Sequence, residues 1–257
     1  MLRITVTIYN QDTFMRDVMS DDEFLTAEAD LNQIPPTLIT LLGLKKTEFL
    51  AEPIKIVTEN SKCERIVVIL LDNFGLFECV YYKPRFIITN VKAIVLLNSD
   101  NPFTKSVMTT IISGGAGGNS FNLFNYIVNN GLKAQLIGCS DDIELLGTAV
   151  NTTITKDDTE TYVQAIKLLN RVDLLWMHFL DFERLYSTYN FQPPITTAQK
   201  LITRTDKWIL TLHKQLKENS QLIVIGTHGK RNMEMGYDEH YKRLRGASVP
   251  IAVFIEK

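Results

Sequence analysis

The fold of this chain is decided by one segment, Ile66-Val67-Val68-Ile69-Leu70-Leu71-Asp72-Asn73-Phe74-Gly75. Six apolar residues, four of them β-branched, follow one another without a polar interruption. Such a run is typical of a strand that is buried on both faces of a parallel sheet. Asp72 then stands at the carboxyl end of the strand, where open α/β sheets bind their ligands. The alternative is that Asp72 only caps the following helix.

Downstream of this segment, strand and helix patterns alternate. The alternation predicts a doubly wound α/β fold, with a mostly parallel sheet and helices on both faces. No linker rich in Gly, Pro or Ser divides residues 66–257, so we expect one core over 63–257 and an N-terminal elaboration over 1–62. The predicted strands are 66–71, 86–88, 92–97, 134–138, 172–179, 221–226 and 249–255. The predicted helices are 74–82, 104–113, 119–130, 140–149, 157–170, 183–188 and 196–218.

The N-terminal part of the chain shows a different pattern of apolar and polar residues. Residues 2–9 alternate between apolar and polar, which predicts a strand that joins a sheet edge in this chain or in the partner of a homo-oligomer. Residues 11–31 are polar and acidic and suggest a helix or a mobile cover. Residues 34–43 begin with prolines and end at a glycine, which predicts a short helix. Residues 44–64 form a charged connector.

Composition narrows the function classes. The 257 residues carry a net charge of −2 and no long basic run, so neither nucleic acid nor a membrane surface is an expected partner. The three cysteines show no Cys-x-x-Cys pairing, which fits a reducing compartment. No signal-peptide pattern and no apolar run of membrane-spanning length is visible in this sequence. These features predict a cytoplasmic protein.

Polar residues that can carry chemistry follow several predicted strands. Thr104 opens a helix, where its hydroxyl can cap the helix or act as a nucleophile beside a metal. The strand at 172–179 leads to Asp181 and Glu183. The strand at 221–226 leads to Thr227-His228-Gly229, a placement that suits a functional histidine. The glycine cluster at 114–118 follows a helix pattern, so we expect a turn near the site and not a dinucleotide loop.

The order of these pieces resembles the alkaline phosphatase superfamily, in particular its cofactor-independent phosphoglycerate mutases and type I phosphodiesterases. The resemblance covers residues 66–254 and the helix at 34–43. In that superfamily a strand-end Asp binds metal, as Asp72 would here. The nucleophilic Ser or Thr precedes a glycine by ten residues, as Thr104 precedes Gly114. Val249-Pro250-Ile251 resembles the closing strand.

The resemblance implies a set of metal ligands and shows where this chain departs from it. The implied ligands are Asp72, Thr104, Glu183 (with Asp181 as its substitute), His228 and His240. The family's third strand is followed by Asp and, four residues on, His, but here these positions are Glu183 and Ser187. The family's Asp-His-Gly begins with Thr227 here. The position of its last His falls near Leu244 or Arg245, and His240 is the nearby histidine. The full set for two ions cannot be assembled.

Two outcomes remain for the ligand chemistry. One divalent ion (Mn, Zn or Mg) is held by the remaining ligands. Alternatively, no metal binds and cations hold an anion as fixed charges; Lys105 and Arg245 lead this group, with Lys230 and Arg231 as further candidates.

The leading hypothesis is a diverged metal-dependent phosphoester or phosphodiester hydrolase, or phosphoryl transferase. It would act on a small phosphorylated molecule with Thr104 as nucleophile. The second is a catalytically inactive member of the fold that serves as a binding or interaction protein. The third is an unrelated α/β enzyme in which Thr104 and His228 are not neighbours.

Overall fold

The protein contains an eight-stranded sheet, seen in a computed structural model that describes residues 25–59, 61–99, 104–115, 121–139, 150–190, 192–227 and 249–257. The strands lie in the order β1-β3-β8-β7-β2-β6-β4-β5. Every neighbouring pair is parallel except the two that involve β8. This confirms the predicted mostly parallel sheet. The strands are β1 (Leu25–Asp30), β2 (Arg65–Leu71), β3 (Ala93–Asn98), β4 (Ala134–Gly138), β5 (Asn151–Ile154), β6 (Leu174–Phe179), β7 (Ser220–Gly226) and β8 (Ile251–Glu256).

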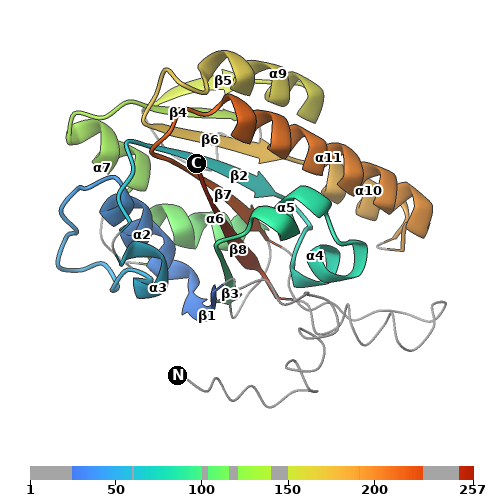
Figure 1. Ribbon diagram of the computed structural model, residues 1–257, viewed down its shortest axis with the longest axis horizontal. Helices are drawn as coiled ribbons and strands as arrows, with labels where there is room; N and C mark the ends of the chain where they lie inside the picture. Colours follow the sequence, from blue (N-terminus) through green and yellow to red (C-terminus); the bar gives the residue numbers. More distant parts are fainter. Residues whose placement is uncertain are drawn as a thin grey trace.

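Helices cover both faces of the sheet (Figure 1). The first face carries the short 3₁₀ helix η1 (Leu31–Gln33), α2 (Ile34–Leu41), α3 (Lys55–Thr58), α6 (Thr104–Ser113) and α7 (Leu123–Asn129). The second face carries α4 (Leu76–Tyr82), α5 (Arg85–Asn90), α9 (Asp158–Leu168), α10 (Asp181–Thr188) and α11 (Ile195–Gln215).

Strand β2 occupies the middle of the sheet, between β7 and β6. Its side chains alternate between the two cores. Ile66, Val68 and Leu70 pack into the first, and Val67, Ile69 and Leu71 pack into the second. The residues from Ile66 to Leu71 have no exposed side-chain surface, as the unbroken apolar run predicts.

Three parts of the predicted secondary structure were wrong. Residues 86–88 lie in helix α5 and not in a strand. Residues 25–30, expected within a helix or cover, form the edge strand β1, and the edge strand β5 was not predicted. The other predicted elements of the core that fall on described residues are confirmed, with ends that shift by a few residues. The predicted strand at 2–9 and the predicted helix at 140–149 lie outside the described residues.

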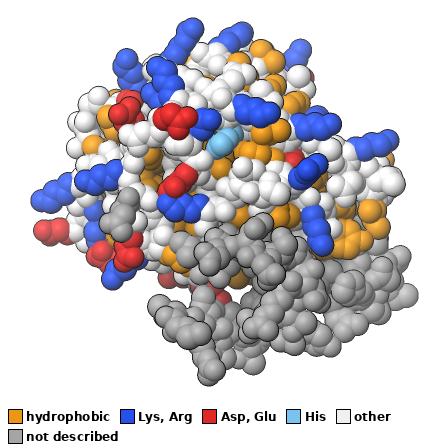
Figure 2. Space-filling model, viewed as in Figure 1, with side chains coloured by type: hydrophobic (Ala, Val, Ile, Leu, Met, Phe, Trp, Pro, Cys, Tyr) orange, Lys and Arg blue, Asp and Glu red, His pale blue; other side chains and the backbone are white. Residues whose placement is uncertain are grey.

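The segment before β2 packs into the first core through α2 and α3. The proposed boundary at residue 62 stays a prediction. None of the helices in the described part is long and apolar enough to cross a membrane. Figure 2 shows one face of the molecule, where lysine and arginine side chains are dispersed among apolar and acidic ones.

Candidate functional site

Three adjacent strands end together at one edge of the sheet and bring polar side chains to it. β7, β2 and β6 are neighbours and run parallel, so their carboxyl ends share this edge. Successive side chains of a strand point to opposite faces. Asp72 follows Leu70 by two residues and Thr227 follows Ile225 by two, so both continue the row that faces the first core. This is also the face that α6 covers.

Two hydroxyl groups converge on the carboxylate of Asp72. Thr104, the first residue of α6, donates a hydrogen bond to Asp72 Oδ1. Thr227 Oγ1 donates to the same oxygen at 3.1 Å and lies 3.2 Å from Thr104 Oγ1. Asp72 is only 6% exposed, and Thr104 is half-buried. The structure therefore brings together Asp72 and Thr104, which the sequence singled out, and adds Thr227 as a direct partner of both.

Gly226 explains how Thr227 comes so close to the end of β2. A Cβ atom on Gly226 would lie 2.3 Å from the carbonyl oxygen of Phe74. Only a residue without a side chain lets the end of β7 lie against the turn that follows Asp72. The backbone N–H of Asn73 in that turn donates to Thr227 Oγ1 at 3.2 Å.

His178 lies on β6 and approaches Asp72 from the side of β2 opposite to Thr227. It lies beside Leu70 in the register of β2 with β6, and its Nε2 is 3.9 Å from Asp72 Oδ2. It is 3% exposed. His178 falls within the strand predicted at 172–179 and is not among the ligands that the resemblance implies. The register of two strands more than 100 residues apart is what puts it next to Asp72.

Glu183 lies in the first turn of α10 and is hydrogen-bonded to the turn that follows Asp72. Asn73 Nδ2 donates to Glu183 Oε2 at 2.7 Å, and Ser187 Oγ donates to Glu183 Oε1 at 2.6 Å. Both carboxylate oxygens therefore have a partner. Ser187 occupies the position where the family pattern has histidine, and it closes a hydrogen bond to Glu183 instead.

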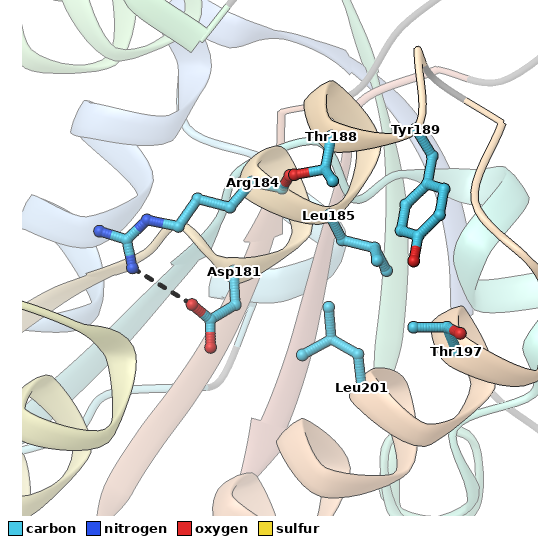
Figure 3. Close-up of a pocket in the computed structure, with 7 residues that line it drawn as sticks. All are labelled: Asp181, Arg184, Leu185, Thr188, Tyr189, Thr197 and Leu201. Atoms are coloured by element: carbon cyan, nitrogen blue, oxygen red, sulfur yellow. Dashed lines mark hydrogen bonds and ion pairs between the residues drawn. The ribbon is translucent and has the colours of Figure 1, made fainter.

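Asp181, the considered substitute for Glu183, has different partners. It forms ion pairs with Arg204 at 2.7 Å and with Arg184 at 3.3 Å. Its side chain borders a shallow, open pocket of about 320 Å³ between α10 and α11, where Leu185 and Leu201 form the apolar wall (Figure 3). Glu183, and not Asp181, is therefore the carboxylate that is hydrogen-bonded to the turn after Asp72.

The start of α10 is held by a buried carboxylate on α9. Asp158 accepts hydrogen bonds from the backbone N–H groups of Leu180 at 2.8 Å and Asp181 at 2.9 Å. Burial raises the pKa of Asp158 to about 6, although these two donors favour its charged form. The position of α10, and with it Glu183, thus depends on a titratable group.

Several predicted site residues cannot be placed. His228, His240 and Arg245 lie outside the described residues, as do Lys230 and Arg231. Lys105 is described and lies exposed on α6, directly after Thr104. The described part of the chain holds no group of three or more His, Cys, Asp or Glu residues that could bind a metal ion.

No protein-family model matches the sequence, and no curated protein does. Solved structures do match. One is a protein in the alkaline phosphatase superfamily from Vibrio parahaemolyticus, with a TM-score of 0.52, 11% identity, and coverage of 88% of this chain and 68% of that one. The fold is that of the alkaline phosphatase superfamily. The C-terminal periplasmic domain of EptC from Escherichia coli matches with a TM-score of 0.52 and 11% identity, over 77% of this chain and 74% of that one.

The lipoteichoic acid synthase LtaP from Listeria monocytogenes also shares this alkaline phosphatase-like fold. Its TM-score is 0.52 at 9% identity, and the match covers 84% of this chain and 70% of LtaP. At such identities the likeness concerns the fold. The resemblance that the sequence suggested is thereby confirmed at the level of architecture, and the chemistry depends on the residues at the edge of the sheet.

Proposed function

We propose that the chain is a phosphoester hydrolase or phosphoryl transferase in which Thr104 is the nucleophile. One observation carries the proposal: the Thr104 hydroxyl, at the N-terminus of α6, donates to the buried carboxylate of Asp72. A nucleophilic hydroxyl needs a partner that accepts its proton and a positive field for the anion that it attacks. Asp72 supplies the acceptor, and the helix N-terminus supplies the field.

The hydrogen bonds orient the nucleophile. Thr104 and Thr227 both direct their hydroxyl protons to Asp72 Oδ1, so the lone pairs of Thr104 Oγ1 point away from that carboxylate. Attack would form a bond from Thr104 Oγ1 to phosphorus and break the bond from phosphorus to the leaving alcohol. The hydroxyl proton passes to Asp72 Oδ1, which already accepts its hydrogen bond, and the departing oxygen takes up a proton from water. Water would then attack the phosphothreonine and release phosphate, or an alcohol would accept the phosphoryl group in a transferase; in either case Thr104 Oγ1 takes its proton back from Asp72.

One divalent ion fits this proposal better than two. Asp72, Thr104 and Glu183 are the described residues that would hold it, with His228 and His240 as candidates beyond them. These three residues would bind the ion through oxygen atoms, which suit Mg or Mn. Zn is a third candidate, because the EptC domain also has a structure in complex with Zn. When bound, such an ion polarises a phosphoryl oxygen and offsets its charge.

The second candidate is an inactive protein that binds a phosphorylated molecule or a partner. It is favoured by the two hydroxyl residues at ligand positions of the family pattern, Thr227 and Ser187. Both are engaged in hydrogen bonds with carboxylates. The small phosphorylated substrate, the cytoplasmic location and the homo-oligomer stay predictions in either case.

Turnover and metal content separate the two candidates. The full chain would be assayed with p-nitrophenyl phosphate and its diester in Mn, Mg or Zn, and its metal content would be measured. The proposal expects about one ion per chain and a turnover that Thr104→Ala removes, while Thr104→Ser keeps a measurable rate. No turnover with any of the three ions would reject the enzyme and leave the binding protein.

A further inference from the structure

Asn73 is a buried side chain that the sequence did not single out. It directly follows Asp72, is 1% exposed, and has a left-handed backbone conformation with φ of 58°. Glycine adopts this conformation without cost, and asparagine is among the few other residues that tolerate it. The turn alone therefore does not require a side chain here, and the amide calls for an explanation of its own.

The orientation of the Asn73 amide is fixed by its partner. Its Nδ2 lies 2.7 Å from Glu183 Oε2, and a carboxylate only accepts hydrogen bonds. The nitrogen must therefore face Glu183. The other atom, Oδ1, is buried and accepts no hydrogen bond from the described part of the chain. A residue that served only to fill space would not leave a buried acceptor unpaired, because this costs stability.

Asn73 connects the two halves of the site. Its backbone N–H donates to Thr227 Oγ1, which in turn donates to Asp72. Its side-chain amide donates a hydrogen bond to Glu183 on α10. The second oxygen of Glu183 is held by Ser187 from the next turn of α10. A carboxylate with a hydrogen bond at each oxygen keeps one orientation. The hydrogen bond from Asn73 is the one that connects the Glu183 carboxylate to the end of β2.

We propose that Asn73 is a positioning residue that holds the Glu183 carboxylate in register with Asp72 and Thr104. The proposal rests on the proposed function, because it assigns Glu183 to the same site. Residues that orient a ligand typically change metal affinity by about 10–100-fold when removed.

The test compares three variants of the full chain: Asn73→Gly, Asn73→Asp and Glu183→Gln. Asn73→Gly is compatible with the left-handed backbone conformation and removes the buried side chain whose amide donates to Glu183. Binding of MnCl2 would be measured by calorimetry, the stability of each metal-free variant by thermal unfolding, and the position of Glu183 by crystallography. We expect Asn73→Gly to leave the melting temperature nearly unchanged, to displace Glu183, and to weaken Mn²⁺ binding by about 10–100-fold.

A double mutant shows whether the effect passes through Glu183. In the Glu183→Gln background, Asn73→Gly should weaken Mn²⁺ binding no further, because the two residues act as one unit. Asn73→Asp places two carboxylates against each other and should also weaken binding. Tighter Mn²⁺ binding by Asn73→Asp would overturn the proposal, since residue 73 would then be a ligand itself.

The crystallographic arm decides the proposal even if the proposed function fails. A wild-type protein that neither binds Mn²⁺ nor turns over an ester would reject that function. The position of Glu183 in Asn73→Gly would still be informative, because it does not depend on metal. A displaced Glu183 supports the positioning role, and an unchanged one overturns it.

Discussion

The end of β2 and the start of α10 both present carboxylates at the same edge of the sheet, but they use them differently. At β2, the hydroxyls of Thr104 and Thr227 converge on Asp72, and no ion pair with Lys or Arg is formed there among the described residues. At α10, Asp181 is ion-paired with Arg184 and Arg204. Glu183, also in the first turn of α10, is hydrogen-bonded to Asn73 after β2 and so links the two regions.

The difference shows which part of the site is suited to chemistry. A carboxylate that is neutralised by two guanidinium groups serves the packing of α10 on α11. A buried carboxylate that orients two hydroxyls at a helix N-terminus can activate one of them. The resemblance implies ligand positions in both regions. The hydrogen-bond partners distinguish the carboxylate that accepts from two hydroxyls, Asp72, from the one held in ion pairs, Asp181.

The strongest test of this comparison exchanges each carboxylate for an amide. Asp72→Asn should lower kcat/KM for an aryl phosphate by about 10²–10³-fold, because the acceptor for Thr104 and the charge for a metal ion are both lost. Asp181→Asn should lower it less than about tenfold, because its partners are arginines outside the site. Equal losses in the two variants would contradict the division between the regions.

The next effect concerns Gly226, whose close approach to the backbone of Phe74 places Thr227 beside Asp72. Gly226→Ala should lower the free energy of unfolding by about 3 kcal/mol, because its Cβ collides with the backbone of Phe74. Gly43→Ala is the matched control: Gly43 has a φ of +70° but no atom within 4 Å of the added Cβ. It should cost only about 1 kcal/mol. Denaturant unfolding measures both, and a Gly226 effect no larger than the control would count against the close fit.

A smaller effect concerns the pH dependence of the α10 region. Burial raises the pKa of Asp158 to about 6 in the folded protein. In the unfolded chain the pKa of an Asp carboxyl is about 3.9. At a pH between these two pKa values, the folded state retains a proton that the unfolded state releases. The contribution of Asp158 to the free energy of unfolding therefore falls as pH rises from about 4 to about 6, by at most about 3 kcal/mol.

Asp158→Asn removes this titration. Denaturant unfolding of the variant across the same pH range should lack the Asp158 contribution, so the difference in stability between variant and wild type should change with pH. A difference that stays constant from about pH 4 to about pH 6 would show that Asp158 does not titrate there.

The sequence predicted the central strands because their signal is local. The apolar run of β2 needs no information from elsewhere in the chain, and the same holds for β7. Residues 86–88 were misread because a three-residue apolar run fits a helix as well as a strand. What decides it is Asp206 on α11, which accepts from the backbone N–H groups of Phe86 at 2.8 Å and Ile87 at 3.0 Å.

The site was predictable only in part for a related reason. Asp72 and Thr104 could be found because each stands at the end of a recognisable element. His178 and Asn73 could not, since their role depends on strand register and on a side chain more than 100 residues away. Thr227 was visible only as a departure from a family pattern, and its contact with Asp72 required the close approach of Gly226.

The central claim is that Thr104 takes up the phosphoryl group. The most direct measurement is to incubate the full chain with an aryl phosphate, quench it in acid, and map phosphorylated peptides by mass spectrometry. The account predicts phosphothreonine at Thr104 in the wild type, more of it when Asp72 is intact than in Asp72→Asn, and none in Thr104→Ala. Turnover with no phosphorylation at Thr104, together with an undiminished rate in Thr104→Ala, would contradict it.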